Sequence, residues 1–272
     1  MSTTTPAPAP PPWSCRATVY TIPLWTTAGV AASPEFQAAA YAPLEAAAPF
    51  ASSALSTPIG GLSMVQLIRY SSSPVGTYDE MLLIPGKFRY EVDGKDGKRE
   101  SKDALRVTRI YVSQRDTCYN GRKNWNIPKH LARFEWTDKP DSTTIKVFPL
   151  HSDSTEPYFQ ATFSAWPYLP GVPISTRVAG YLVDMTLVQP PVPSGAGESG
   201  DAAALAGTDT WCKVTPYIYS PRARLGWVDL QQAGGSPFAP FASSRWLVGA
   251  KLEDAVIEFG EGATWSTPAS SQ

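Results

Sequence analysis

The feature that most constrains this fold is a succession of short segments with the composition of β-strands. Each is rich in β-branched or aromatic residues, several alternate between apolar and polar side chains, and Gly, Pro or Asp separates many of them. The predicted strands cover residues 65–70, 80–84, 87–92, 106–113, 143–148, 158–165, 180–188, 210–215 and 225–230. Their number predicts a large, mainly antiparallel sheet or barrel.

Between these strands the sequence predicts one helix and one long loop. Residues 35–41 lie in an alanine-rich stretch and predict a helix that Pro43 ends or kinks, because proline has no amide donor. Residues 189–207 are rich in Pro, Gly, Ser and Ala and poor in large apolar side chains, which predicts a mobile loop. We expect one domain over residues 14–261, a disordered tail over 1–13 and a frayed tail over 262–272.

The charge balance argues against several classes of partner. With 23 Lys and Arg against 24 Asp and Glu, the net charge is -1, so nothing attracts the whole chain to nucleic acid or to an anionic membrane. No stretch approaches the roughly 20 apolar residues that span a bilayer, and the N-terminus lacks the pattern of a secretory signal. The three cysteines form no CxxC pair. We therefore expect a cytoplasmic protein without a nucleic-acid or membrane partner.

The sequence offers little support for a bound metal or nucleotide. His151 has no second histidine or paired cysteine nearby, so we expect no metal site. No glycine-rich phosphate loop follows a predicted strand, and no Gly-x-Ser-x-Gly motif is present, which argues against nucleotide-dependent enzymes and serine hydrolases. We expect no cofactor.

Residues 119–135 combine cations with large apolar side chains. The cations include Arg122, Lys123, Lys129 and His130, and the apolar residues between and after them include Trp125, Ile127, Leu131 and Phe134. A surface loop has no need of these apolar residues, and a core segment does not tolerate the cations without partners. The mixture therefore predicts the wall of a pocket.

Two motifs in this region resemble those of the acetoacetate decarboxylase-like superfamily. Gly121-Arg122, five further residues, Pro128-Lys129 and then Leu131 resemble the active-site segment, in which the lysine after the proline is the nucleophile. Upstream, Tyr78-Asp79-Glu80 before a predicted strand is similar to a second signature, whose glutamate enters the active site. The chain resembles a divergent member, with similarity from about residue 62 to 136 that fades toward 230.

The resemblance implies an α+β fold with a curved, mainly antiparallel sheet or cone-like barrel that encloses a pocket. It implies catalytic roles for Lys129, Glu80 and His130, and substrate-binding roles for Gln66, Tyr78, Arg122, Trp125 and Asn126. This chain has His130 at the position where the family has a second lysine. Gln66 is its nearest counterpart of a second carboxylate of the family. Near the N-terminus, where the family has an arginine that binds the substrate carboxylate, only Arg16 is available.

Several of these residues also have plainer interpretations. The pattern also fits Glu80 as an exposed strand carboxylate or a structural partner of Arg122, and His130 as a solvated neighbour of the lysine. Asparagine in a turn usually bonds its own backbone, and this interpretation is favoured for Asn126. Tyr78 could simply pack.

The chemistry of the resembled family depends on a neutral lysine. The amine attacks a ketone to give an iminium ion, which accepts electrons when a bond to a carboxylate breaks. An ordinary lysine has a pKa of about 10.4, so this role requires surroundings that destabilise the ammonium. We predict a lyase acting on a small keto acid or polyketide-like ketone, most directly a decarboxylase. Alternatives are an aldolase, dehydratase or cyclase using the same imine, or a non-catalytic small-molecule-binding protein. The resemblance leaves a homo-oligomer open.

Overall fold

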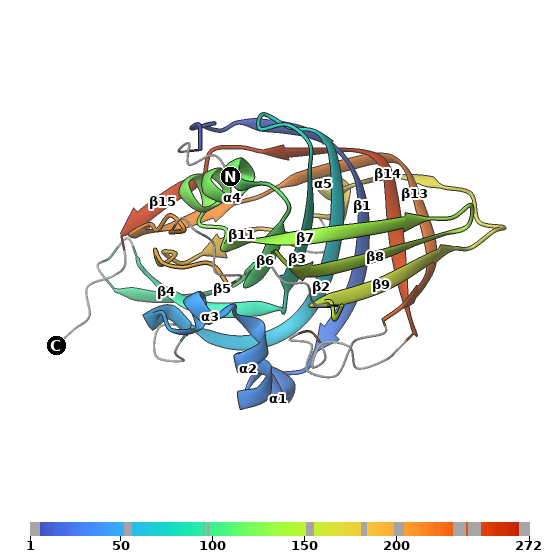
Figure 1. Ribbon diagram of the computed structural model, residues 1–272. Helices are drawn as coiled ribbons and strands as arrows, with labels where there is room; N and C mark the ends of the chain where they lie inside the picture. Colours follow the sequence, from blue (N-terminus) through green and yellow to red (C-terminus); the bar gives the residue numbers. More distant parts are fainter. Residues whose placement is uncertain are drawn as a thin grey trace.

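Nine strands form a closed ring in the computed structural model, which describes residues 6–51, 56–94, 96, 98–150, 155–180, 184–198, 204–230, 238 and 246–266 (Figure 1). Around the ring they are β1 (Trp13–Thr26), β14 (Trp246–Phe259), β13 (Tyr217–Asp229), β9 (Phe159–Ala165), β8 (Ser142–Pro149), β7 (Lys129–Asp138), β6 (Arg109–Val112), β3 (Tyr78–Ile84) and β2 (Thr57–Ser72). Antiparallel pairing of β1 with β2 closes the barrel. The predicted fold class is confirmed.

Further strands extend the sheet beyond the barrel. From the first residues of β2 the order continues through β4 (Lys87–Asp93), β5 (Arg99–Leu105), β11 (Leu187–Gln189), β12 (Thr210–Val214) and β15 (Ala263–Ser266), while β10 (Val172–Ser175) pairs with β13. Most pairs are antiparallel, as predicted. Among the described strands, only β6–β7 and β5–β11 are parallel.

Short helices occupy two regions of the chain. The helices α1 (Ala28–Ala31), α2 (Pro34–Ala40) and α3 (Pro43–Ala46) and the 3-10 turn η1 (Pro49–Ala51) connect β1 to β2 and lie together on one side of the barrel (Figure 1). The predicted helix at residues 35–41 corresponds to α2, where Ser33 caps the N-terminus. The other helices are α4 (Arg115–Trp125), which crosses from β6 to β7, and α5 (Thr176–Ala179).

Successive side chains of the barrel strands point to opposite faces and so form two separate apolar clusters. Met64 and Ile68 of β2 and Leu82 of β3 point into the barrel, whereas Leu67 and Met81 point to the other face. The second cluster also contains buried side chains of α2, which therefore covers that face. The inside of the barrel is thus walled by alternate residues of its strands.

The described residues nearest the two ends of the chain are bonded to the domain. Trp13 is buried at the start of β1, and Asn120 hydrogen-bonds the backbone of Ala7 and Ala9, so the described part of the expected tail at 1–13 is attached to the domain. At the other end, β15 pairs with β12 where the frayed tail was expected to begin. A side chain of α4 thus holds Ala7 and Ala9, and backbone pairing with β12 holds β15.

The expected mobile loop at residues 189–207 also differs from the structure where it is described. Val192 is buried, the Pro193 carbonyl accepts a hydrogen bond from a buried arginine, and Gly195 pairs with Leu205. Residues 199–203 lie outside the described residues. The described parts are bonded to the domain, which the small side chains alone did not indicate.

None of the helices in the described part of the chain combines the length and the apolar character needed to cross a membrane.

Candidate active site

A largely apolar cavity lies inside the barrel. Its lining is formed by Trp13, Met64, Gln66, Ile68, Tyr70, Tyr78, Glu80, Leu82, Ile84, Val107, Ile110, Trp125, Ile127, Lys129, Thr176, Met185, Leu187, Pro216, Ile218, Ile257 and Phe259. Lys129 is the only cation and Glu80 the only carboxylate among these residues. The polar groups of the cavity are therefore concentrated around one lysine.

Lys129 begins β7 and extends its amine into this cavity. Its Nζ lies 2.7 Å from a carboxylate oxygen of Glu80 and donates a hydrogen bond to Thr117 Oγ1 at 2.9 Å. The side chains of Lys129 and Glu80 are only 6% and 4% exposed, so water screens this ion pair little. The two groups are close enough to exchange a proton.

Two tyrosines complete the polar side of the cavity. Tyr70 Oη donates a hydrogen bond to Glu80 Oε1 at 3.2 Å, and the Tyr70 and Tyr78 rings stack with centroids 4.2 Å apart. Burial, followed by the nearby charge of Glu80, raises the pKa of both tyrosines well above the ordinary value. Their hydroxyl groups therefore keep their protons and act as hydrogen-bond donors at neutral pH.

The crossover helix α4 determines where Lys129 lies. Gln114 caps its N-terminus by accepting a hydrogen bond from the Thr117 amide, and Asn126 ends it in the left-handed conformation with φ of 55°. The chain then enters β7, which pairs in parallel with β6 so that Lys129 is beside Ile110. Gly121 faces the lysine side chain across this turn. One helix thus supplies both Thr117 and the space for the lysine.

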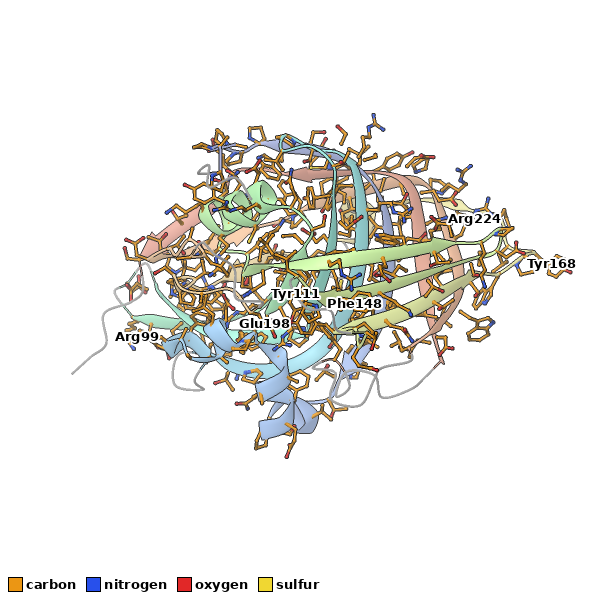
Figure 2. All side chains as sticks on the ribbon, viewed as in Figure 1. Arg99, Tyr111, Phe148, Tyr168, Glu198 and Arg224 are labelled. Carbon is orange, nitrogen blue, oxygen red and sulfur yellow. The ribbon has the colours of Figure 1, made fainter. Side chains whose placement is uncertain are left out.

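His130 points to the opposite face of β7. Its Nε2 donates to Glu45 Oε2 at 2.7 Å, and its Nδ1 accepts from the Glu198 amide at 3.1 Å. Arg122 donates to Glu45 Oε1 at 2.9 Å, and its side chain is fully buried. Tyr111, beside Glu198 in Figure 2, donates to that carboxylate at 2.6 Å. These groups form a buried charged cluster outside the cavity.

Glu45 is the central carboxylate of that cluster. Burial opposes its ionisation, but the hydrogen bond from His130 and the charge and hydrogen bond of Arg122 more than offset burial and lower the Glu45 pKa. Glu45 is therefore ionised at neutral pH. It connects α3 to α4 and β7.

The structure divides the sequence-predicted residues into two groups. Lys129, Glu80, Gln66, Tyr78 and Trp125 line the cavity, whereas His130, Arg122 and Asn126 do not. The last three lie outside the cavity, because His130 follows Lys129 in a strand whose successive residues face opposite ways, Arg122 bonds to Glu45, and Asn126 is a helix cap. Asn126 Nδ2 instead donates to the Thr210 carbonyl.

Sequence reasoning missed three residues of these clusters. Tyr70 is four residues beyond Gln66 in β2 and so shares its face, a signal that strand alternation provides. Thr117 is four residues before Gly121 in α4, which the sequence did not predict as a helix. Glu45 stands in an alanine-rich stretch with no local signal of its contacts.

The arginines of the barrel do not reach the cavity. Arg16 is exposed on β1, and Arg106 and Arg109 bond to Tyr41 on the face covered by the helices. Within the described lining, no arginine is available to bind a substrate carboxylate beside Lys129.

Comparisons with known proteins agree with this architecture. The sequence matches no protein-family model, and a search of curated proteins returns no match. Solved structures do match. An acetoacetate decarboxylase from Legionella pneumophila has 14% identity and a TM-score of 0.60, covering 97% of this chain and 94% of its own.

Two further structures give similar values. Another acetoacetate decarboxylase structure has 12% identity and a TM-score of 0.58, covering 97% of this chain and 93% of its own. The enduracididine biosynthesis enzyme MppR, complexed with pyruvate, has 13% identity and a TM-score of 0.56, covering 95% of this chain and 92% of its own. The chain therefore has the acetoacetate decarboxylase-like fold.

Proposed function

We propose that this chain is an enzyme that forms a Schiff base between Lys129 and a ketone and acts as a lyase on a keto acid, with decarboxylation as its reaction. The observation that carries the proposal is the buried Lys129 amine, which lies in an apolar cavity 2.7 Å from Glu80. Enzymes activate lysine as a nucleophile for carbonyl carbons in apolar surroundings of this kind. The shared fold supports the same assignment.

Glu80 is placed to exchange the protons that imine formation requires. Its carboxylate takes a proton from the Lys129 ammonium, and the neutral amine attacks the ketone carbon. After the proton on nitrogen moves to oxygen, Glu80 returns its own proton to the hydroxyl group. Water then leaves, and an iminium ion remains.

Loss of carbon dioxide follows from the electron demand of the iminium nitrogen. The electron pair of the bond to the substrate carboxylate flows toward that nitrogen, carbon dioxide leaves and an enamine forms. A proton adds to the enamine carbon, and water hydrolyses the iminium ion to release the product and restore Lys129. The apolar walls favour cleavage of the bond to the substrate carboxylate, because a localised carboxylate charge is poorly stabilised there.

The absence of an arginine from the described lining of the cavity favours a second reaction class. Aldol condensation, dehydration or cyclisation through the same imine does not require a substrate carboxylate to be bound beside the lysine. Lys129 itself is the only cation among the described residues of the cavity. One structural neighbour, MppR, was solved with the condensation product of pyruvate and imidazole 4-carboxaldehyde.

Product analysis with carboxyl-labelled β-keto acids tests the proposal and separates the two classes. We expect the wild type to release labelled carbon dioxide and Lys129→Ala to show only the background rate. Glu80→Gln should reduce the rate by about a hundredfold, a typical contribution of general acid–base catalysis. Lys123→Ala removes an exposed lysine of α4 outside the cavity and should behave as wild type.

Two other results would redirect the assignment. Consumption of the ketone with retention of the label would replace decarboxylation by the second class. Identical behaviour of wild type and Lys129→Ala with every ketone would contradict catalysis and favour a binding protein.

A further inference from the structure

A second depression, here called the vestibule, adjoins the cavity beside α5. Thr176, Met185 and Pro216 line both spaces and so form the boundary between them. The vestibule is also lined by Arg177 and Tyr217. The cavity that contains Lys129 therefore has a neighbouring space directly beyond these three residues.

The vestibule contains a cation that the cavity lacks. Arg177 is exposed, and its guanidinium carbon lies 4.3 Å from the ring centroid of Tyr217, which orients the side chain. Within the described part of the chain, no carboxylate forms an ion pair with Arg177. Its charge is therefore free to meet an anionic group.

Asp184 is the one carboxylate among the described residues of the vestibule. It accepts a hydrogen bond from the Thr186 amide at 2.9 Å, and hydrogen bonds from Thr186 lower its pKa. Asp184 is therefore ionised and opposes the binding of an anion. Arg177 and Asp184 thus have opposite effects on the affinity of the vestibule for an anionic group.

We propose that the substrate enters through the vestibule and that Arg177 determines specificity by binding an acidic group at the end remote from the reacting ketone. The inference rests on the proposed role of Lys129. A carboxylate is costly to bury among apolar walls, whereas in the vestibule it remains hydrated and faces a guanidinium. The substrate class is a ketone with an apolar body and a terminal acid.

Calorimetric titration with two matched ligands tests this assignment. The ligands are hexanoylacetone, a neutral β-diketone, and its counterpart in which the terminal methyl group of the hexanoyl chain is a carboxylate. We expect the wild type to bind the acid about fivefold more tightly, the upper range for an exposed ion pair, with the preference reduced by high salt. Arg177→Gln should abolish the preference and leave hexanoylacetone binding unchanged.

Two further variants serve as a control and as a test of the opposing charge. Arg133→Gln is the matched control, because Arg133 lies 4.1 Å over the Phe148 ring but lines none of the described cavities, and it should retain the preference. Asp184→Asn removes the opposing charge and should increase the preference. Retention of the preference by Arg133→Gln, which removes the same charge elsewhere on the surface, excludes a general effect of surface charge.

The outcomes separate this inference from the proposed function. Equal binding of both ligands by the wild type, binding of neither, or an unchanged preference in Arg177→Gln would overturn the role of Arg177. Borohydride reduction of the same samples reports the imine independently. A preference that depends on Arg177 without any adduct on Lys129 would support the vestibule and contradict the Schiff base.

Discussion

At the scale of the residue, the position of Lys129 depends on a missing side chain. A Cβ atom at Gly121 would lie 2.6 Å from Lys129 Cδ and 2.7 Å from Cε. Carbon atoms in favourable contact are about 3.5–4.0 Å apart, so any other residue must displace the lysine or the helix. The glycine lets the lysine pass α4 and reach Glu80.

Gly121→Ala is therefore expected to remove activity with little loss of stability. Alanine is a better helix former than glycine by about 1 kcal/mol, which offsets part of the crowding. We expect imine formation to fall at least about tenfold, which corresponds to about 1.4 kcal/mol, while the thermal midpoint changes little. Gly29→Ala in α1 is the matched control, because a Cβ there meets nothing within 4 Å. Wild-type imine formation by Gly121→Ala would contradict this account.

At the scale of the element, Glu45 joins three segments that are distant in sequence. It accepts hydrogen bonds from Arg122 of α4 and His130 of β7, and all three side chains are buried. Removing one member of a buried ionic group leaves its partners without compensation, which costs several kcal/mol. Glu45 is therefore expected to fix α3 against the barrel.

Glu45→Gln is expected to lower the free energy of unfolding by about 3 kcal/mol at neutral pH. Because the folded-state pKa of Glu45 is lowered, its contribution is present above the unfolded value of about 4.3 and is lost as pH falls through the folded pKa. Denaturant titrations should show that the difference in the free energy of unfolding between wild type and variant becomes smaller as the pH is lowered. A difference independent of pH would contradict this.

A surface ion pair provides the control. Glu91→Gln removes the ion pair of Glu91 with Arg99, which is labelled at the edge of the molecule in Figure 2. Both side chains of this pair are about half exposed, so the loss should be below about 1 kcal/mol.

These elements also show what the sequence could and could not predict. Most central strands were predicted because β-branched and aromatic residues recur in them. The helix α4 was not, because its buried face includes Thr117, Asn120 and Arg122 and so lacks an apolar period. Once Lys129 is known to begin a strand, alternation alone places His130 on the other face. Its contact with Glu45 joins residues 85 positions apart, which no local pattern indicates.

At the scale of the whole molecule, β1 closes the barrel between β14 and β2. Its first residue, Trp13, packs edge-on against Trp125 with ring centroids 5.1 Å apart, and both line the cavity. Trp13 was expected in a tail, although alternate residues from Trp13 onward are buried. Trp13 therefore contributes both to the closure of the barrel and to the shape of the cavity.

Trp13→Ala is expected to affect both properties. The free energy of unfolding should fall by about 3–5 kcal/mol, the usual cost of truncating a buried tryptophan, and the cavity should accept bulkier ketones. Trp25→Ala, at an exposed position of the same strand, should change stability by less than about 0.5 kcal/mol. Denaturant unfolding and a ligand series measure the two effects. Equal losses in the two variants would contradict the closing role of Trp13.

Borohydride trapping tests the central claim most directly. The folded protein is incubated with a panel of β-keto acids and β-diketones, reduced, and analysed by intact mass and peptide mapping, with Lys129→Ala in parallel. We expect one reduced adduct on Lys129 and none in the variant. Absence of an adduct with every ketone, or adducts of equal yield in Lys129→Ala, would contradict it.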